Sequence, residues 1–366
     1  MDSSWTSCAR ARSRAWLLPG AALAAAAALA SCGSSGGTSG STGSGSGTAQ
    51  SPLSTNSAAA GLQAQYQQVV RTVLPSVVQI STSNSTGSGV VYDSKGDIVT
   101  NAHVVGGSRT VQVRPATSSK SLQARVIGSF DPDDLAVIRV DKDAGALKPA
   151  AFADSQQARI GEIVLAMGNP LGLTDSVTQG IVSATGRTVS GAGESGSGAA
   201  LIAAAIQTSA DINPGNSGGA LVNLGGQVLG IPTLAAREPN GGGAAPGIGF
   251  AIPSNTVKKI AGQLITSGRV TDSGRASLGI SAQTVVNDQG QPGGVAVVAV
   301  VSGGPAAKAG LRAGDVIIGI GSQGTPSLAA LEGNLASRRP GDDVTVHIVR
   351  NGRQHQVSLV LGSLPG

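Results

Sequence analysis

Aromatic side chains are scarce in this sequence: they make up 2% of its 366 residues, whereas hydrophobic residues make up 40%. That hydrophobic fraction is too high for a chain disordered throughout. Because aromatic residues are so few, its cores must be built from aliphatic side chains. The formal net charge is +5, but the basic residues are scattered and lack interleaved aromatics. A nucleic-acid partner is therefore not expected.

Cysteine is almost absent, and both cysteines, Cys8 and Cys32, lie near the N-terminus. Arg10, Arg12 and Arg14 precede an apolar stretch of roughly 15 residues. This stretch is shorter than the about 20 residues that a membrane-spanning helix needs. This pattern is typical of a secretory signal. Leu29-Ala30-Ser31-Cys32 resembles a bacterial lipobox, which implies cleavage before Cys32 and its diacylation. We predict a lipoprotein signal peptide over residues 1–31; an uncleaved signal anchor is the alternative.

Removal of Cys8 and lipidation of Cys32 leave no pair for a disulfide. The residues that follow are almost all small and polar, a composition that cannot bury enough apolar surface to become ordered. We predict a disordered tether over residues 32–60 that holds the rest of the chain close to a membrane. Beyond it, short runs of strand-forming residues alternate with turn residues, which indicates a mainly β fold.

Histidine is also scarce, because the sequence contains only three. His347 and His355 lie in a separate C-terminal region, which leaves His103 as the candidate for chemistry. It follows the apolar run Ile98-Val99-Thr100, so it should lie at the rim of a barrel. A lone histidine is more often structural than catalytic, and the assignment therefore depends on its partners.

A carboxylate partner is available in the segment Asp131-Pro132-Asp133-Asp134. A buried aspartate there can accept the Nδ1 hydrogen of the imidazole and stabilise the imidazolium formed during nucleophilic attack. We select Asp134, because it directly precedes an apolar strand. Asp131 and Asp133 flank a proline and are expected in a turn at the surface. A turn or capping role is the alternative for all three.

A nucleophile is predicted in the glycine-rich segment 213–219. Ser217 is the candidate nucleophile, and the backbone amides of Gly215, Asn216 and Ser217 are the candidate oxyanion hole, because glycines allow the tight turn that points amides inward. An ordinary glycine-rich loop is the alternative. The chain order His, Asp, Ser matches chymotrypsin-type proteases and differs from the orders of subtilisins and α/β-hydrolases.

Several further motifs occur in a fixed order. They are Gly87-Ser88-Gly89-Val90-Val91, Thr100-Asn101-Ala102-His103-Val104-Val105, Asp134-Leu135-Ala136-Val137, Gly168-Asn169-Pro170-Leu171-Gly172, Gly180-Ile181-Val182-Ser183-Ala184, Asn213-Pro214-Gly215-Asn216-Ser217-Gly218-Gly219 and Gly247-Ile248-Gly249-Phe250-Ala251-Ile252-Pro253. In these motifs the chain resembles the high-temperature-requirement (HtrA, DegP-like) serine proteases. The resemblance implies a trypsin-like double six-stranded β-barrel, here residues 61–268, and the degradation of misfolded or damaged envelope proteins. It also implies that the activity needs no metal or other cofactor and that the protein assembles as a homotrimer.

One departure from the family concerns the segment Ile231-Pro232-Thr233, where many relatives resemble Ile-Asn-Thr. The resemblance implies that this segment flanks the primary specificity pocket and binds the substrate backbone. Proline has no N–H to donate, so we expect altered registration of the substrate. The small apolar neighbours favour cleavage after small aliphatic residues.

The C-terminal part begins with a helix predicted from Ser254, as its N-cap, to Gly268, followed by a linker. Residues 275–363 then resemble a bacterial PDZ domain, a β-sandwich with two helices. The resemblance implies that the amides of Leu278, Gly279 and Ile280 bind the terminal carboxylate of a peptide.

In such a domain the peptide adds as a strand beside a helix, here the one predicted around residues 327–337. Its leucines, Leu328, Leu331 and Leu335, would line the groove; the alternative is that they only fill the core. The Asn351-Gly352 pair predicts a hairpin between the last two strands.

Three functions remain open on these grounds. The first is a membrane-tethered endopeptidase that degrades unfolded polypeptides. The second is a non-catalytic chaperone or peptide-binding scaffold, and the third is a signalling protease with one envelope target.

Overall fold

The computed structural model describes residues 57–118, 120–169, 176–190, 201–213, 215–237, 244–286 and 290–365. The predicted signal peptide, Cys32 and most of the predicted tether lie outside these ranges. Among the residues described, no helix is both long and apolar enough to cross a membrane.

The first described element is helix α1 (Ser57–Val73). It begins inside the range predicted as a disordered tether, so residues 57–60 correct that prediction. Alanine has the highest helix propensity, and three successive alanines, Ala58 to Ala60, follow the first residue. Only the C-terminal part of the helix is buried, at Val69 and Val73.

Six strands then form a closed barrel in the order β1-β2-β3-β6-β5-β4. They are β1 (Val77–Ser81), β2 (Thr86–Val91), β3 (Asp97–Thr100), β4 (Thr110–Pro115), β5 (Leu122–Phe130) and β6 (Leu135–Val140). Along β4 buried and more exposed residues alternate, which is the two-residue period of a strand with one face in a core. The interior is aliphatic, as the composition predicts, with Val78, Ile80, Ile98 and Ile138 all fully buried.

A second closed barrel follows in the order β10-β11-β12-β9-β8-β7. Its strands are β7 (Ile163–Gly168), β8 (Ser176–Ser190), β9 (Leu201–Thr208), β10 (Ala220–Asn223), β11 (Val228–Arg237) and β12 (Ala244–Pro253). The predicted pair of six-stranded barrels is therefore confirmed. One hydrophobic cluster joins them, and it includes Val90 and Val99 of the first barrel and Leu165 and Met167 of the second.

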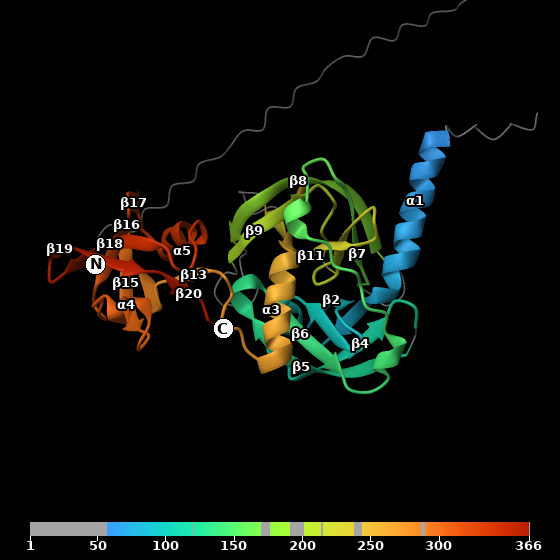
Figure 1. The fold of residues 1–366 in the computed structure, drawn as a ribbon, viewed down its shortest axis with the longest axis horizontal. Coiled ribbons are helices and arrows are strands. Elements are labelled where there is room, and N and C mark those ends of the chain that lie inside the picture. The colour runs from blue at the N-terminus through green and yellow to red at the C-terminus, as the bar shows by residue number, and fades with distance from the viewer. Residues whose placement is uncertain are drawn as a thin grey trace, which may run out of the picture. The chain divides into compact units, whose positions relative to one another are not determined.

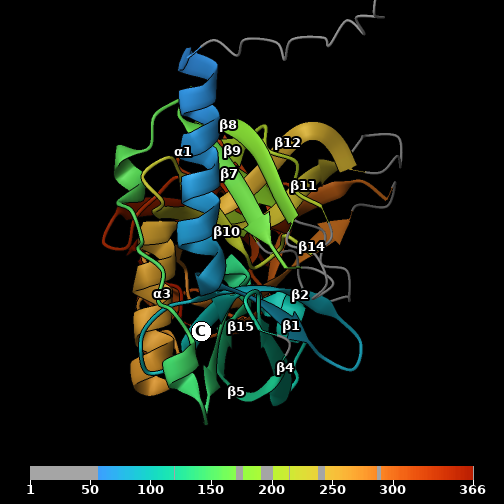
Figure 2. The same ribbon diagram turned by 90° about the vertical axis from the view of Figure 1, so that its right-hand side faces the viewer.

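Helix α3 (Ser254–Ser267) packs against β5 and β6 of the first barrel and β11 and β12 of the second (Figures 1 and 2). Its buried positions follow the predicted helical spacing, and it ends at Gly268, whose φ of 70° is left-handed. The predicted N-cap is one residue too late, because Pro253 occupies that position. Ser254 is completely buried and its Oγ donates to the carbonyl of Ala153 at 2.9 Å.

The C-terminal region is built on a sheet of strand order β14-β15-β16-β18-β19, with β17 paired to β16 and a separate pair of β13 with β20. Its elements are β13 (Ala276–Ser277), β14 (Ile280–Val286), β15 (Pro292–Val300), α4 (Pro305–Lys308), β16 (Val316–Ile320), β17 (Gln323–Gly324), α5 (Leu328–Ala336), β18 (Asp343–Arg350), β19 (Arg353–Val360) and β20 (Gly362–Ser363). Helix α5 is capped by Ser327, which accepts from the amide of Ala330. The predicted hairpin is confirmed, since Asn351 and Gly352 join β18 to β19 with φ of 51° and 75°.

Short helices complete the description. They are α2 (Ala102–Val105), η1 (Leu74–Ser76), η2 (Asp131–Asp133), η3 (Ala144–Ala146) and η4 (Ser155–Gln157). Of these, α2 and η2 carry residues of the candidate active site.

Candidate active site

His103 and Asp134 come from the two short helices that flank strands β3 and β6. Helix α2 follows β3 directly and carries His103, while Asp134 is the C-cap of η2. The imidazole Nδ1 lies 2.8 Å from Oδ2 of Asp134 and 3.0 Å from its Oδ1, and the amide of His103 donates to Oδ1 at 3.0 Å. A carboxylate in this position holds the hydrogen on Nδ1 and leaves Nε2 able to accept a proton.

The aspartate is held at both its side chain and its backbone. Its side chain is 7% exposed, and the hydroxyl of Thr233 donates to its Oδ2. Its carbonyl accepts from Nδ2 of Asn101 at 2.9 Å and from the amide of Ala102 at 3.2 Å. Asp134 has a left-handed backbone with φ of 50°, which costs a non-glycine residue about 1 kcal/mol or more. These contacts stabilise that conformation.

Ser217 lies in a tight turn ahead of β10, with a half-buried side chain. Its Oγ donates to the carbonyl of Thr233 at 3.4 Å. The turn needs glycine: Gly215 and Gly218 have φ of 107° and 81°, and a Cβ on Gly218 would lie 2.2 Å from the carbonyl oxygen of Ser88.

The three predicted oxyanion donors differ in their partners. The amide of Asn216 donates to the carbonyl of Asn213 at 3.0 Å inside the turn. Within the described ranges, the amides of Gly215 and Ser217 have no hydrogen-bond acceptor. No described residue thus competes with an anionic oxygen for these two amides, whereas the amide of Asn216 is occupied.

Ser88 of the first barrel joins the turn to its surroundings. Its Oγ donates to the carbonyl of Gly215 at 2.5 Å and accepts from the amide of Asn169 at 2.8 Å. Its backbone amide donates to the carbonyl of Ser217 at 2.9 Å. A serine within a strand carries no local signal for such a role, and the sequence shows it only as part of a motif.

The segment predicted to flank the specificity pocket lies in β11. Ile231 has no exposed surface and belongs to the hydrophobic core. The carbonyl of Pro232 accepts from the amide of Gly218 at 3.0 Å. Thr233 contacts two members of the predicted triad, Asp134 through its hydroxyl and Ser217 through its carbonyl. The family resemblance implies that Thr233 lies near the substrate, but nothing in the sequence shows that it contacts both Asp134 and Ser217.

Asp133 is not the surface residue that its position beside a proline predicts. It is 3% exposed and forms an ion pair with Arg275, whose Nη1 lies 3.0 Å from its Oδ1. Burial raises the pKa of Asp133 to about 6, although the guanidinium of Arg275 opposes the rise. Asp131, in contrast, is exposed in the turn, as predicted.

The predicted carboxylate-binding residues lie at the start of β14, which is an edge strand of its sheet. Leu278 is buried, and Gly279 is left-handed with φ of 72°. The amide of Gly279 donates to Oγ of Ser277 at 3.0 Å, so Ser277 occupies one of the three predicted donors. Ile280 opens β14 itself.

All three α5 leucines contribute to the core, as the alternative interpretation expects. Leu331 is buried in the core, whereas Leu328 and Leu335 are partly buried against it.

Two closed β-barrels with a buried aspartate on a histidine, followed by a domain built on a six-stranded sheet with β14 at one edge, define a trypsin-like serine protease with a PDZ domain. Residues 87–231 match the family model of the trypsin-like peptidase domain, and residues 276–361 match that of the PDZ domain.

Comparison with known proteins makes the class more specific. The chain is 40% identical over 296 residues to the serine protease Do-like HtrA of Lactobacillus helveticus, covering 76% of this chain and 68% of that protein. It is 39% identical over 284 residues to the periplasmic serine endoprotease DegP of Escherichia coli, covering 75% and 56%. The crystal structure of the serine endoprotease from Yersinia pestis matches with a TM-score of 0.55 and 36% identity, over 82% of this chain and 98% of that one. The chain belongs to the HtrA/DegP family of serine proteases.

Proposed function

We propose that His103, Asp134 and Ser217 form the catalytic triad of an endopeptidase. The observation that carries the proposal is the contact of the Asp134 carboxylate with both the amide and Nδ1 of His103. In this mechanism Ser217 Oγ attacks the carbonyl carbon of the scissile peptide, and Nε2 of His103 accepts its proton and later transfers it to the leaving amine. Asp134 stabilises the imidazolium in between.

The developing oxyanion binds the amides of Gly215 and Ser217, which have no acceptor among the described residues. The hydroxyl of Ser217 leaves the carbonyl of Thr233 when it turns to His103. A contact of 3.4 Å is a weak hydrogen bond, so this rotation loses little. Removing one such oxyanion donor in a serine protease typically costs about 100-fold to 1000-fold in kcat.

The test is hydrolysis of an unfolded model protein by the wild type and by Ser217→Ala. We expect the variant to lose at least about 1000-fold in kcat while keeping the melting temperature of the wild type. Ser209→Ala, a serine outside the turn whose Oγ accepts from the amide of Ile181, is the matched control. Equal hydrolysis by wild type and Ser217→Ala would leave the chaperone or scaffold function as the better one.

For the substrate and its location, we propose unfolded or damaged polypeptides in the bacterial cell envelope. Relatives named as periplasmic serine endoproteases support the location. In this arrangement residues 1–31 are a lipoprotein signal peptide, Cys32 is lipidated, residues 32–60 contain the tether, and residues 61–268 and 275–363 are the protease and PDZ domains. The assembly is a homotrimer.

For the PDZ domain we propose binding of peptide C-termini along β14. As an edge strand it can pair with an added strand, and the start of α5 is joined to it by the amide of Leu328, which donates to Oγ1 of Thr284 at 2.9 Å. The carboxylate-binding amides are those of Leu278, Gly279 and Ile280. Ser277 must release the amide of Gly279 before that amide binds a carboxylate, which lowers the affinity.

A further inference from the structure

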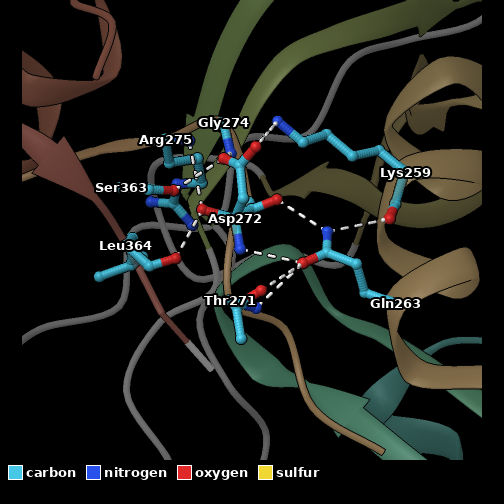
Figure 3. Close-up of polar contacts among 9 residues, drawn as sticks. Lys259, Gln263, Thr271, Asp272, Gly274, Arg275, Ser363 and Leu364 are labelled. Atoms are coloured by element: carbon cyan, nitrogen blue, oxygen red, sulfur yellow. Dashed lines mark hydrogen bonds and ion pairs between the residues drawn. The ribbon is translucent and has the colours of Figure 1, made fainter. Parts of the chain in front are cut away.

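The linker, residues 268–275 between α3 and β13, forms hydrogen bonds and an ion pair with helix α3 (Figure 3). Gln263 of α3 accepts from the amides of Thr271 and Asp272 at 3.0 and 2.9 Å, and its Nε2 donates to the carbonyl of Asp272 at 2.7 Å. Nζ of Lys259 lies 3.1 Å from Oδ2 of Asp272. The beginning of the linker is thus held by the protease domain.

The end of the linker is held by the last strand of the PDZ domain, as Figure 3 also shows. The hydroxyl of Ser273 donates to the carbonyl of Leu364 at 2.8 Å, and the amide of Leu364 donates to the carbonyl of Arg275 at 2.8 Å. These contacts continue the pairing of β13 with β20. The backbone of Arg275 therefore moves with the PDZ domain.

The side chain of Arg275 extends back to the protease domain. Its Nη1 donates to the carbonyl of Pro132 at 2.8 Å and to Oδ1 of Asp133 at 3.0 Å. Both partners belong to η2, whose C-cap is Asp134. The side chains of this ion pair are 14% and 4% exposed, so water screens it little.

Arg275 also acts on a residue of the PDZ domain. Burial raises the pKa of Glu332, a residue of α5, and the positive charge of Arg275 opposes that rise. The guanidinium is thus close enough to one carboxylate on each domain to interact with both.

We propose that Arg275 is a positioning residue for Asp134: by binding Pro132 and Asp133 it holds η2 in the conformation that presents the carboxylate of Asp134 to His103. The proposal rests on the triad proposed above. The left-handed backbone of Asp134 is strained, and such a conformation persists only where its surroundings determine it. Arg275 supplies that support from the linker.

The experiment compares Arg275→Met, which keeps an apolar stem but no donor, with Arg275→Lys, which keeps the charge, in the full chain. We expect Arg275→Met to lower kcat for a peptide substrate by about 10-fold to 100-fold with KM within about twofold, as for loss of orientation in an active site. Arg275→Lys should recover much of that loss. Arg269→Met, an exposed arginine of the same linker, is the matched control and should behave as the wild type.

A second readout is the low-field proton resonance of His103 Nδ1, which reports its hydrogen bond to Asp134. It should broaden or shift in Arg275→Met and stay unchanged in Arg269→Met. The proposal is overturned if folded Arg275→Met keeps the wild-type kcat and resonance, or if Arg269→Met loses as much activity. If Arg275→Met does not fold, Asp133→Asn decides: a wild-type kcat and resonance in folded Asp133→Asn overturns the proposal, and a lowered kcat supports it. Activity in Ser217→Ala would instead disprove the triad.

Discussion

Single residues in this protein make more than one contact at the candidate active site. Thr233 binds Asp134 with its hydroxyl and Ser217 with its carbonyl. Asp133 and Asp134 are neighbours in sequence and both buried, yet one binds the arginine of a linker and the other a histidine. Two neighbours in sequence thus differ in proposed role: Asp134 is the proposed triad residue, and Asp133 is part of the proposed support for η2.

The pKa of Asp133 leads to a prediction about stability and pH. It is about 6 in the folded chain against an ordinary value of 3.8. A carboxyl group whose pKa is raised by folding stabilises the fold fully at pH values below its unfolded-state pKa, here 3.8. This stabilisation is lost as the pH rises through its folded-state pKa, here about 6. From pH 4 to pH 7 the wild type should therefore lose up to about 3 kcal/mol relative to Asp133→Asn.

Urea denaturation of both proteins at several pH values measures this difference. Asp131→Asn is the matched control, because Asp131 is exposed in the same short helix. The prediction is wrong if the difference between wild type and Asp133→Asn is independent of pH, or if it grows in favour of the wild type as the pH rises.

At the level of helices, strands and turns, glycine positions determine where the backbone can approach itself. The turn that carries Ser217 lies directly against strand β2, where the backbone amide of Ser88 donates to the carbonyl of Ser217. Helix α3, in contrast, contains Gly262 at a position where an added Cβ would contact nothing within 4 Å. The same substitution should therefore have opposite effects at the two places.

Gly218→Ala should destabilise the protein by at least about 2 kcal/mol and reduce its activity, because the new Cβ meets a carbonyl oxygen in a left-handed turn. Gly262→Ala should stabilise it by roughly 0.5 to 1 kcal/mol through helix propensity. Chemical denaturation and kcat measure both effects. Equal stability changes in the two variants would contradict the prediction.

At the level of the whole chain, the proposed lipidation of Cys32 leads to a prediction about membrane attachment. If Cys32 is the lipidated residue, Cys32→Ala should abolish incorporation of labelled palmitate and release the protein from the membrane fraction, because a diacylated cysteine is a stable anchor. Cys8→Ala is the matched control, since Cys8 would be removed with the signal peptide. Palmitate incorporation in Cys32→Ala would show that the lipid lies elsewhere.

Much of this organisation can be predicted from the sequence, because it depends on local pattern. The period of the strands, the helix ending at Gly268 and the Asn351-Gly352 hairpin follow from side-chain alternation and backbone propensity. The candidate nucleophile and histidine follow from a motif and from the scarcity of histidine. The choice of Asp134 follows from its place directly before an apolar strand.

Other features depend on contacts between segments that are distant in the sequence. Asp133 and Arg275 are separated by 142 residues, and Asp134 and Thr233 by 99. No periodicity or spacing in the sequence links the two members of either pair, and only the closure of the barrels and the path of the linker bring them together. Composition and local pattern therefore decided the elements and the candidate residues, Asp134 among them, whereas the tertiary structure decided which residues contact and support them, because burial and ion pairing depend on distance in space.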